Sequence, residues 1–105
     1  MIVELTKNNF EQEVLQYEGI VLVDFWATWC GPCRRFGEVL HALEGENLPN
    51  FKIGKINVDL EEELAQTFRV MSIPTVLIYK NGKIVDNFLG GKSLLDTKKL
   101  IESYL

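Results

Sequence analysis

Short runs of apolar residues alternate along the 105-residue chain with longer segments in which apolar residues recur at helical spacing. The run at 20–26 is apolar almost throughout, which is typical of a strand that is buried on both faces, and 51–58 forms a second apolar strand. The last two runs flank Asn81-Gly82, a dipeptide that strongly favours a tight hairpin turn. The pattern therefore predicts five strands, at 2–5, 20–26, 51–58, 75–79 and 83–88.

Four segments with helical spacing separate or follow these strands. Thr6 and Ser93 are predicted N-caps, because a hydroxyl oxygen accepts a hydrogen bond from the first turn of a helix. Pro32 suits a first turn, where its missing N–H group has no intrahelical partner to lose. The predicted helices are 6–17, 32–44, 61–68 and 93–105, and the last is expected to turn Leu94, Ile101, Tyr104 and Leu105 toward the core.

The order of these elements limits the topology. A strand–helix–strand unit places its two strands in parallel, whereas a hairpin places them antiparallel. The chain shows no internal repeat, low-complexity tract or linker. We therefore predict a single α/β domain over residues 1–105, with a mixed sheet and helices on both of its faces.

Charge and hydropathy argue against several classes of protein. The net charge is −4, which provides no basic surface for nucleic acid or for an anionic membrane. No apolar stretch is long enough to span a bilayer, and the first residues lack the pattern of a signal peptide. We therefore expect a cytoplasmic protein that binds neither nucleic acid nor membranes.

The only two cysteines lie in the run Trp29-Cys30-Gly31-Pro32-Cys33, which directly follows the predicted strand at 20–26. Residues three apart at the start of a helix lie on one face, with their Cα atoms roughly 5–6 Å apart. A disulfide tolerates this separation, so the two sulfurs can bond and part with little movement of the backbone.

A structural disulfide and a zinc site are the alternatives. Closing so short a loop stabilises a fold by only roughly 2 kcal/mol, and a structural bridge usually joins distant segments. Zinc requires four ligands, and the chain adds only His41 to its two cysteines. We therefore favour reversible thiol–disulfide chemistry and expect no metal. We interpret His41 as a surface residue, because it lies about two helical turns beyond Cys33.

The cysteine motif and three further segments resemble the thioredoxin family. The active-site segment of that family is similar to Val23-Asp24-Phe25-Trp26-Ala27-Thr28-Trp29-Cys30-Gly31-Pro32-Cys33. Three further segments resemble its cis-proline loop, its hairpin and the glycine near its active site: Ile73-Pro74-Thr75, Lys80-Asn81-Gly82 and Gly90-Gly91. The resemblance covers nearly the whole chain, and it implies the thioredoxin fold, a central five-stranded mixed sheet flanked by four helices.

The resemblance implies chemical roles for four residues. Cys30 is expected to be the nucleophile, since a helix N-terminus favours its thiolate, and Cys33 is expected to resolve the mixed disulfide. Asp24 matches a carboxylate that transfers protons to and from the inner thiol, and burial is expected to raise its pKa. Lys55 matches a lysine beside that carboxylate. On the residues alone, Asp24 facing water at a strand end and Lys55 reaching the surface are the alternatives.

The resemblance also implies an apolar surface that docks protein substrates. The backbone of Ile73, left free beside Pro74, is expected to pair with an extended substrate segment. Trp26 is expected to support the core instead. The expected substrate-binding residues are Trp29, Gly31, Pro32, Ile73, Pro74, Gly90 and Gly91.

The dipeptide between the cysteines bears on the direction of electron flow. Gly31-Pro32 offers a thiolate neither a charge nor a side-chain donor, so we expect the pair to act as a reductant. The resemblance implies that the chain, expected to be a monomer, binds no cofactor and receives electrons from NADPH through a separate thioredoxin reductase. Its implied acceptors are ribonucleotide reductase, peroxiredoxin and methionine sulfoxide reductase. The rival functions are a dithiol oxidase or isomerase, a non-catalytic binding subunit and a metal-binding protein.

Two segments depart from the family's pattern. Gly37-Glu38 lies where many thioredoxins have a proline in the active-site helix, and a glycine weakens a helix by about 1 kcal/mol relative to alanine. We therefore expect a change in the shape or stability of this helix, with unchanged chemistry. Arg34-Arg35 places two positive charges where the family more often has a basic residue followed by an apolar one. These charges either favour the thiolate or lie solvated at the surface.

Overall fold

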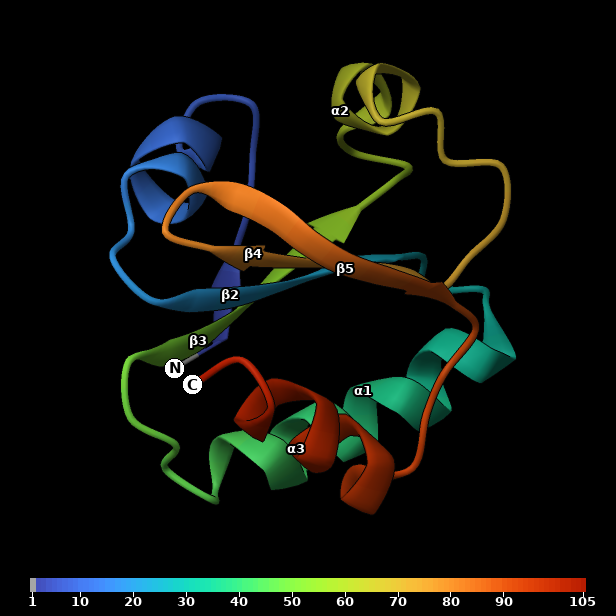
Figure 1. The fold of residues 1–105 in the computed structure, drawn as a ribbon. Helices are drawn as coiled ribbons and strands as arrows, with labels where there is room; N and C mark the ends of the chain where they lie inside the picture. Colours follow the sequence, from blue (N-terminus) through green and yellow to red (C-terminus); the bar gives the residue numbers. More distant parts are fainter. Residues whose placement is uncertain (1) are drawn as a thin grey trace.

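The computed structural model describes residues 2–105 and arranges them around one five-stranded sheet (Figure 1). β3 pairs in parallel with β1 and β2, whereas β4 pairs antiparallel with β2 and β5. The predicted mixed sheet is therefore confirmed. In their spatial order the strands are β1 (Ile2–Glu4), β3 (Phe51–Asn57), β2 (Ile20–Trp26), β4 (Thr75–Lys80) and β5 (Lys83–Leu89).

Helices cover both faces of the sheet (Figure 1). α1 (Gly31–Glu44) and α3 (Leu94–Glu102) lie against one face. The short helix η1 (Glu11–Leu15) and α2 (Glu62–Thr67) lie against the other. The expected architecture, a five-stranded mixed sheet flanked by four helices, is confirmed.

The buried side chains of β2 divide between two cores, because successive residues of a strand point to opposite faces. Leu22 packs with Phe36 of α1 in one core, whereas Val23 packs with Phe10 in the other. By this alternation, Asp24 shares the face of Leu22. The Asp24 carboxylate therefore lies in the layer that α1 covers.

α1 begins at the cysteine motif and runs unbroken through Gly37 and Glu38. The side chains of Arg34 and Arg35 in its first turns are exposed. The helix packs against the sheet through its buried residues, which are Cys33, Phe36, Gly37, Leu40 and Leu43.

The β4–β5 hairpin turns at Asn81-Gly82, as predicted. Both residues have positive φ angles, 51° and 81°, which a tight turn between twisted antiparallel strands requires. A side-chain carbon on Gly82 would also collide with the carbonyl oxygen of Leu15 in η1. At the start of α3, the Ser93 hydroxyl accepts a hydrogen bond from the N–H of Asp96, so this predicted N-cap is confirmed.

The first helix is shorter than the prediction of 6–17. Regular helix within this segment covers Phe10 and the five residues of η1. The hydroxyl of Thr6 accepts a hydrogen bond from the N–H of Asn8, so Thr6 caps the start of this segment as predicted. The side chain of Asn9 in turn accepts a hydrogen bond from the N–H of Thr6 and donates one to the carbonyl oxygen of Glu4. Residues 7–9 form turns, and η1 ends at Leu15, before the predicted end of the helix.

The prediction that Leu105 belongs to the core is wrong. α3 ends at Glu102, and the side chain of Leu105 is 50% exposed. Of its predicted neighbours, Ile101 is fully buried, while Leu94 and Tyr104 are half-buried. Because the helix ends before the last residue, helical spacing no longer decides where Leu105 points.

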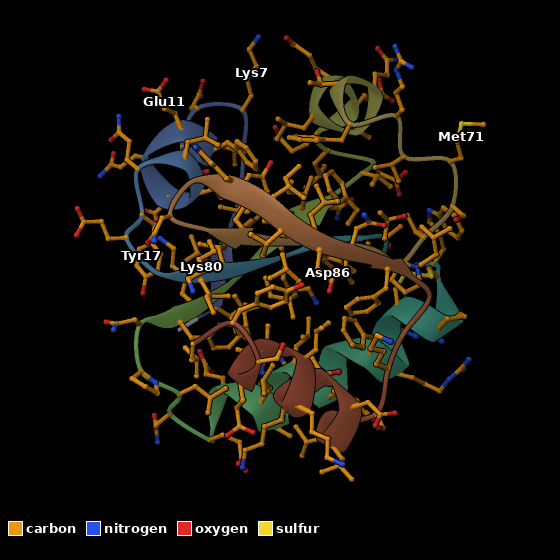
Figure 2. The ribbon with its side chains drawn as sticks, viewed as in Figure 1. Lys7, Glu11, Tyr17, Met71, Lys80 and Asp86 are labelled. Carbon is orange, nitrogen blue, oxygen red and sulfur yellow. A yellow bond between two sulfur atoms is a disulfide. The ribbon has the colours of Figure 1, made fainter. Side chains whose placement is uncertain are left out.

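Side chains fill the space between the sheet and the helices on both sides (Figure 2). The labelled Lys7, Glu11 and Met71 point away from the molecule (Figure 2). Met71 is 94% exposed, which is unusual for a large apolar side chain. It lies in the segment that joins α2 to β4.

Candidate active site

The two cysteines form a disulfide at the N-terminus of α1. Their Cα atoms are 5.2 Å apart, within the range predicted from their spacing. Cys30 is the N-cap residue, and its sulfur accepts a hydrogen bond from the N–H of Cys33 at 3.2 Å. The N–H groups and the dipole at this end of a helix stabilise a thiolate once the disulfide is open. Cys30 is 6% exposed, while Cys33 is fully buried, so an incoming protein can reach only Cys30.

The loop before β4 contributes the second part of the site. The peptide bond between Ile73 and Pro74 is cis, as the family resemblance implies. The carbonyl oxygen of Ile73 lies 3.8 Å from Sγ of Cys30, and Ile73 packs against the cluster formed by Ala27, Cys30 and Cys33. Pro74 is buried, and its carbonyl oxygen accepts a hydrogen bond from the N–H of Gly90 at 2.8 Å. The loop therefore presents Ile73 beside the disulfide, with Pro74 beneath the surface.

Trp29 is the largest exposed side chain next to the cysteines, with 68% of its surface accessible. Its indole N–H donates a hydrogen bond to the carboxylate of Asp59 at 2.8 Å. The sequence analysis gave no role to Asp59, so its contact with Trp29 was missed. Parallel strands end at the same edge of a sheet. Trp29 follows β2 and Asp59 follows β3, so the parallel pairing of these two strands brings both residues to the same edge of the sheet. The strand–helix–strand order of the sequence was therefore the signal for this contact.

A groove of about 400 Å³ adjoins Trp29 and Ile73 on the side of α2. Both residues were expected at the substrate surface, whereas Val70 and Met71 were not. The signal for them is the apolar pair Val70-Met71, which precedes Ile73 with one serine between. The groove is lined by Trp29, Val58, Ala65, Val70, Met71, Ser72 and Ile73.

The structure also places the other predicted contact residues around the disulfide. Gly31 and Pro32 lie between the two cysteines, and Pro32 is exposed. Gly90 is tied to the cis-proline loop by the hydrogen bond described above. A side-chain carbon on Gly91 would lie 3.3 Å from the ring of Phe36, so the segment after β5 passes directly against α1. Trp29, Gly31, Pro32 and Ile73 therefore lie next to the redox pair, whereas Gly90 is linked to it through Pro74 of the cis-proline loop and Gly91 through Phe36 of α1.

Asp24 is fully buried in the middle of the sheet, so the alternative that it faces water is wrong. Its neighbours across the strands are Lys55 of β3 and Val76 of β4. Neither carboxylate oxygen has a hydrogen-bond partner among residues 2–105. Burial raises the pKa of Asp24 from its ordinary 3.8 to about 7, and the positive charge of Lys55 lowers it by a smaller amount. Asp24 can therefore exchange a proton near neutral pH.

Lys55 lies beside Asp24, as predicted, with Nζ 3.8 Å from Oδ2 of the carboxylate. The same Nζ lies 4.4 Å from the centre of the Trp26 ring, which gives this ammonium a second favourable contact. A side-chain carbon on Gly37 would stand 3.5 Å from Nζ, so α1 packs over the lysine without a side chain at that point. In the sequence, the only sign that α1 would pack over Lys55 was a glycine inside a predicted helix.

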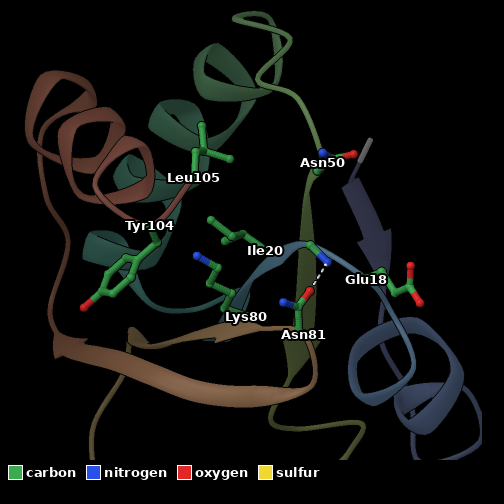
Figure 3. Close-up of a pocket in the computed structure, with 8 residues that line it drawn as sticks. Glu18, Ile20, Asn50, Lys80, Asn81, Tyr104 and Leu105 are labelled. Atoms are coloured by element: carbon green, nitrogen blue, oxygen red, sulfur yellow. Dashed lines mark hydrogen bonds between the residues drawn. The ribbon is translucent and has the colours of Figure 1, made fainter.

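The far end of β2 carries a separate hollow of about 330 Å³ (Figure 3). It surrounds Ile20, the first residue of β2, whereas the cysteines follow the last residue of this strand. A seven-residue strand is roughly 20 Å long, so the hollow is remote from the disulfide. Figure 3 shows Asn81 turned toward Gly19, whose N–H donates a hydrogen bond to the Asn81 side chain at 2.9 Å. The exposed side chain of Lys80 lines the same hollow.

His41 is exposed on α1, as predicted. Among residues 2–105, no group of three or more histidine, cysteine, aspartate and glutamate side chains is placed to hold a metal ion. Within the same range, no helix combines the length and the apolar character needed to cross a membrane.

A disulfide between an accessible and a buried cysteine, at a helix N-terminus beside a cis-proline loop, defines the class of thiol–disulfide oxidoreductases. The sequence model of the thioredoxin family matches residues 1–103 of the chain. The thioredoxin of Listeria monocytogenes is 44% identical over 105 residues, which cover the whole of both chains. The thioredoxin of Bacillus subtilis is 42% identical over 104 residues, covering 99% of this chain and 98% of the relative. A protein named Thioredoxin 2 from Chlorobaculum tepidum is 44% identical over 101 residues, covering 94% of this chain and 92% of the relative.

The chain therefore belongs to the thioredoxin family. It is a protein-disulfide reductase with a redox-active Cys30–Cys33 pair.

Proposed function

We propose that the chain is a single-domain, monomeric dithiol carrier of the cytoplasm, which passes two electrons to disulfides in other proteins. Unequal access to the two sulfurs carries this proposal. Cys30 is 6% exposed at the helix N-terminus, whereas Cys33 is fully buried. A substrate can therefore reach the outer sulfur, while the inner sulfur reacts only with what the outer one has already bound.

Cys30 is the nucleophile in the first step. Its thiolate, stabilised by the N–H groups of the first turn, attacks one sulfur of the substrate disulfide. A bond forms between Cys30 and the substrate, the substrate's own S–S bond breaks, and the departing thiolate takes up a proton.

The substrate segment is held beside Ile73 during this step. The backbone of Ile73 makes no backbone hydrogen bond within residues 2–105, which supports its pairing with an extended segment as an added strand. The proposed contact residues are Trp29, Gly31, Pro32, Ile73, Pro74, Gly90 and Gly91.

Cys33 resolves the mixed disulfide in the second step. Its thiol gives its proton to Asp24, and the resulting thiolate attacks Sγ of Cys30. The Cys30–Cys33 bond forms, and the second substrate sulfur leaves as a thiolate. The dithiol has then lost two electrons, and the substrate disulfide has become two thiols. Lys55 is the partner that adjusts how readily Asp24 accepts the proton.

The chain acts as a reductant within this cycle. Gly31-Pro32 brings no charge toward the Cys30 thiolate, which supports a reductant over an oxidant. Electrons come from NADPH through a separate thioredoxin reductase, and the chain itself binds no cofactor. Its acceptors are ribonucleotide reductase, peroxiredoxin and methionine sulfoxide reductase.

The reduction potential of the pair tests the direction of electron flow. The protein is equilibrated in graded dithiothreitol buffers, and the oxidised fraction is followed by tryptophan fluorescence. We expect a potential below that of the glutathione pool, which a disulfide reductase needs. A clearly higher potential would identify an oxidase or isomerase instead.

Two serine variants test the roles of the cysteines. Cys33→Ser is expected to accumulate a mixed disulfide with a disulfide-linked peptide, because the attacking sulfur remains and the resolving one is gone. Cys30→Ser is the matched control and is expected to accumulate none. Mass spectrometry of the non-reduced proteins distinguishes the two, and the opposite pattern would reverse the assignment.

A further inference from the structure

A second hollow, of about 200 Å³, adjoins the redox pair and shares no lining residue with the groove beside Trp29. Pro32, which lies between the two cysteines, forms part of its wall. Phe36 and Val39 give the hollow an apolar face, while Arg35 and Lys92 bring two cations to it. The full lining is Pro32, Arg35, Phe36, Val39, Gly91 and Lys92.

The guanidinium of Arg35 points toward the N-terminus of α1, where Gly31 and Pro32 lie. Long side chains in helices normally point in this direction. A side-chain carbon on Gly31 would stand 3.7 Å from Nη1 of Arg35. This cation is therefore held beside the residues that separate Cys30 from Cys33.

Lys92 reaches the same hollow from the segment between β5 and α3. Its ammonium lies 4.9 Å from the centre of the Phe88 ring. The Phe88 ring packs edge-on against Phe36, with their centres 5.9 Å apart. The second cation therefore lies over Phe88, which itself packs against Phe36 in the wall of the hollow.

Neither cation is neutralised by an ion pair within the part of the chain that the structure describes. No ion pair within 4.0 Å joins Arg35 or Lys92 to a carboxylate among residues 2–105. In contrast, the exposed Lys7 and Lys98 each form an ion pair, with Glu63 and Glu46. A positive site thus stands beside the cysteines in a chain whose net charge is −4.

The charge on the Trp29 side of the cysteines has the opposite sign. Asp59 lies there, bonded to the indole of Trp29. A substrate segment that crosses the pair therefore meets a carboxylate on one side and two cations on the other. This asymmetry favours one arrangement of charge in the substrate.

We propose that this hollow is a subsite for an acidic side chain of the protein substrate, close in sequence to the disulfide that is reduced. The substrate carboxylate contacts Arg35 and Lys92, and its methylene groups lie against Phe36 and Val39. The inference rests on the proposed disulfide reduction and names a class of substrate for it: disulfides flanked by aspartate or glutamate.

The test compares peptide disulfides that differ only in charge. Each is a dimer of a short peptide with one cysteine, and glutamate or glutamine is placed one or two residues before or after that cysteine. The reduced protein is mixed with each dimer, and its oxidation is followed by tryptophan fluorescence to give a second-order rate constant. The readout is the glutamate-to-glutamine ratio of rate constants, because a change in the reactivity of Cys30 cancels from this ratio.

We expect at least one position at which the wild type prefers glutamate by about three- to tenfold, the range that one or two exposed ion pairs supply. The double variant Arg35→Gln/Lys92→Gln is expected to lose this preference. Lys80→Gln removes an exposed positive charge at the far end of β2 and is expected to keep it. Because the interaction is between exposed charges, the preference is also expected to shrink at about 1 M salt.

Each other outcome has a distinct meaning. Equal reduction of all the dimers would overturn the subsite and leave the proposed reductase function standing. A glutamate preference that survives in the double variant would place the acid elsewhere and also overturn the subsite. Reduction of none of the dimers would overturn the proposed function, and the subsite with it.

Discussion

Asp24 makes the stability of this protein depend on pH, and Asp24→Asn isolates that dependence. The pKa of Asp24 is raised from 3.8 to about 7 in the folded state, chiefly by burial. Between these values the folded protein holds a proton that the unfolded chain has released. The free energy of unfolding therefore falls as pH rises from about 4 to about 7, by about 1.4 kcal/mol per pH unit. Over about three pH units, the loss attributable to Asp24 is about 4 kcal/mol.

Asparagine has nearly the shape of aspartate but does not titrate. Like the neutral acid of the wild type at pH 4, its amide would be buried without a hydrogen-bond partner, so this cost is similar in the two proteins and does not vary with pH. We therefore expect the stability of Asp24→Asn to lie within about 1 kcal/mol of the wild type at pH 4. At pH 8 the wild type carries the full destabilisation of a buried charge, so the variant is expected to be the more stable by about 4 kcal/mol. The difference should therefore grow between these two pH values.

Urea unfolding of both oxidised proteins between pH 4 and pH 8 measures this difference, with tryptophan fluorescence and circular dichroism as independent probes. Glu102→Gln, which removes an exposed carboxylate, is the matched control and should follow the wild type across the range. At each pH, the free energy of unfolding of the wild type is subtracted from that of the variant to give the variant's relative stability. The test is how much this difference changes between pH 4 and pH 8, because effects of the substitution that do not depend on pH cancel from the change. A relative stability that does not vary with pH would refute the claim that burial raises the pKa of Asp24.

Three further substitutions probe the surroundings of the site. Lys55→Met removes the positive charge that lowers the pKa of Asp24, so the pKa of Asp24 should rise above its wild-type value. Carbon-13 NMR titration of the Asp24 carboxyl group measures this change, and an equal or lower pKa would contradict this role for Lys55. Leu40→Ala empties a fully buried position under α1 and should lower the free energy of unfolding by about 2–5 kcal/mol in urea titrations, whereas a loss below 1 kcal/mol would mean that the core refills the space. Gly37→Ala should raise the free energy of unfolding by about 1 kcal/mol, since the added carbon meets only Nζ of Lys55 at an ordinary 3.5 Å; a loss of stability would show that Lys55 cannot accommodate it.

The parts of the site that depend on sequence neighbours could be predicted. Cys30 and Cys33 lie one helical turn apart, and Pro32 suits a first turn, so the sequence pattern alone indicated a disulfide at a helix start. The apolar run that contains Asp24 indicated a strand buried on both faces, and a carboxylate inside such a strand has a raised pKa.

Contacts between distant parts of the chain were harder to predict. Lys55 meets Asp24 through the register of β2 and β3, which the residues alone do not fix. Arg35 and Lys92 line one hollow because the segment after β5 passes against α1, a matter of tertiary packing. At the N-terminus, helical periodicity predicted a helix over 6–17 but carried no information on where regular helical hydrogen bonding begins and ends, and η1 covers only Glu11–Leu15.

The destabilising effect of Asp24 and its proposed chemical role have one physical cause. Cys33 is buried on the inner face of α1, so a group that takes its proton has to lie in the same layer between helix and sheet. Any carboxylate in that layer loses its hydration, which raises its pKa toward neutrality and lowers the stability of the charged form. A substitution that removes the destabilisation consequently removes the proton acceptor as well. Asp24→Asn should therefore be more stable at pH 8 yet resolve the mixed disulfide with a peptide substrate more slowly. If it combined greater stability with an unchanged rate of resolution, the Cys33 proton would have to leave by another route.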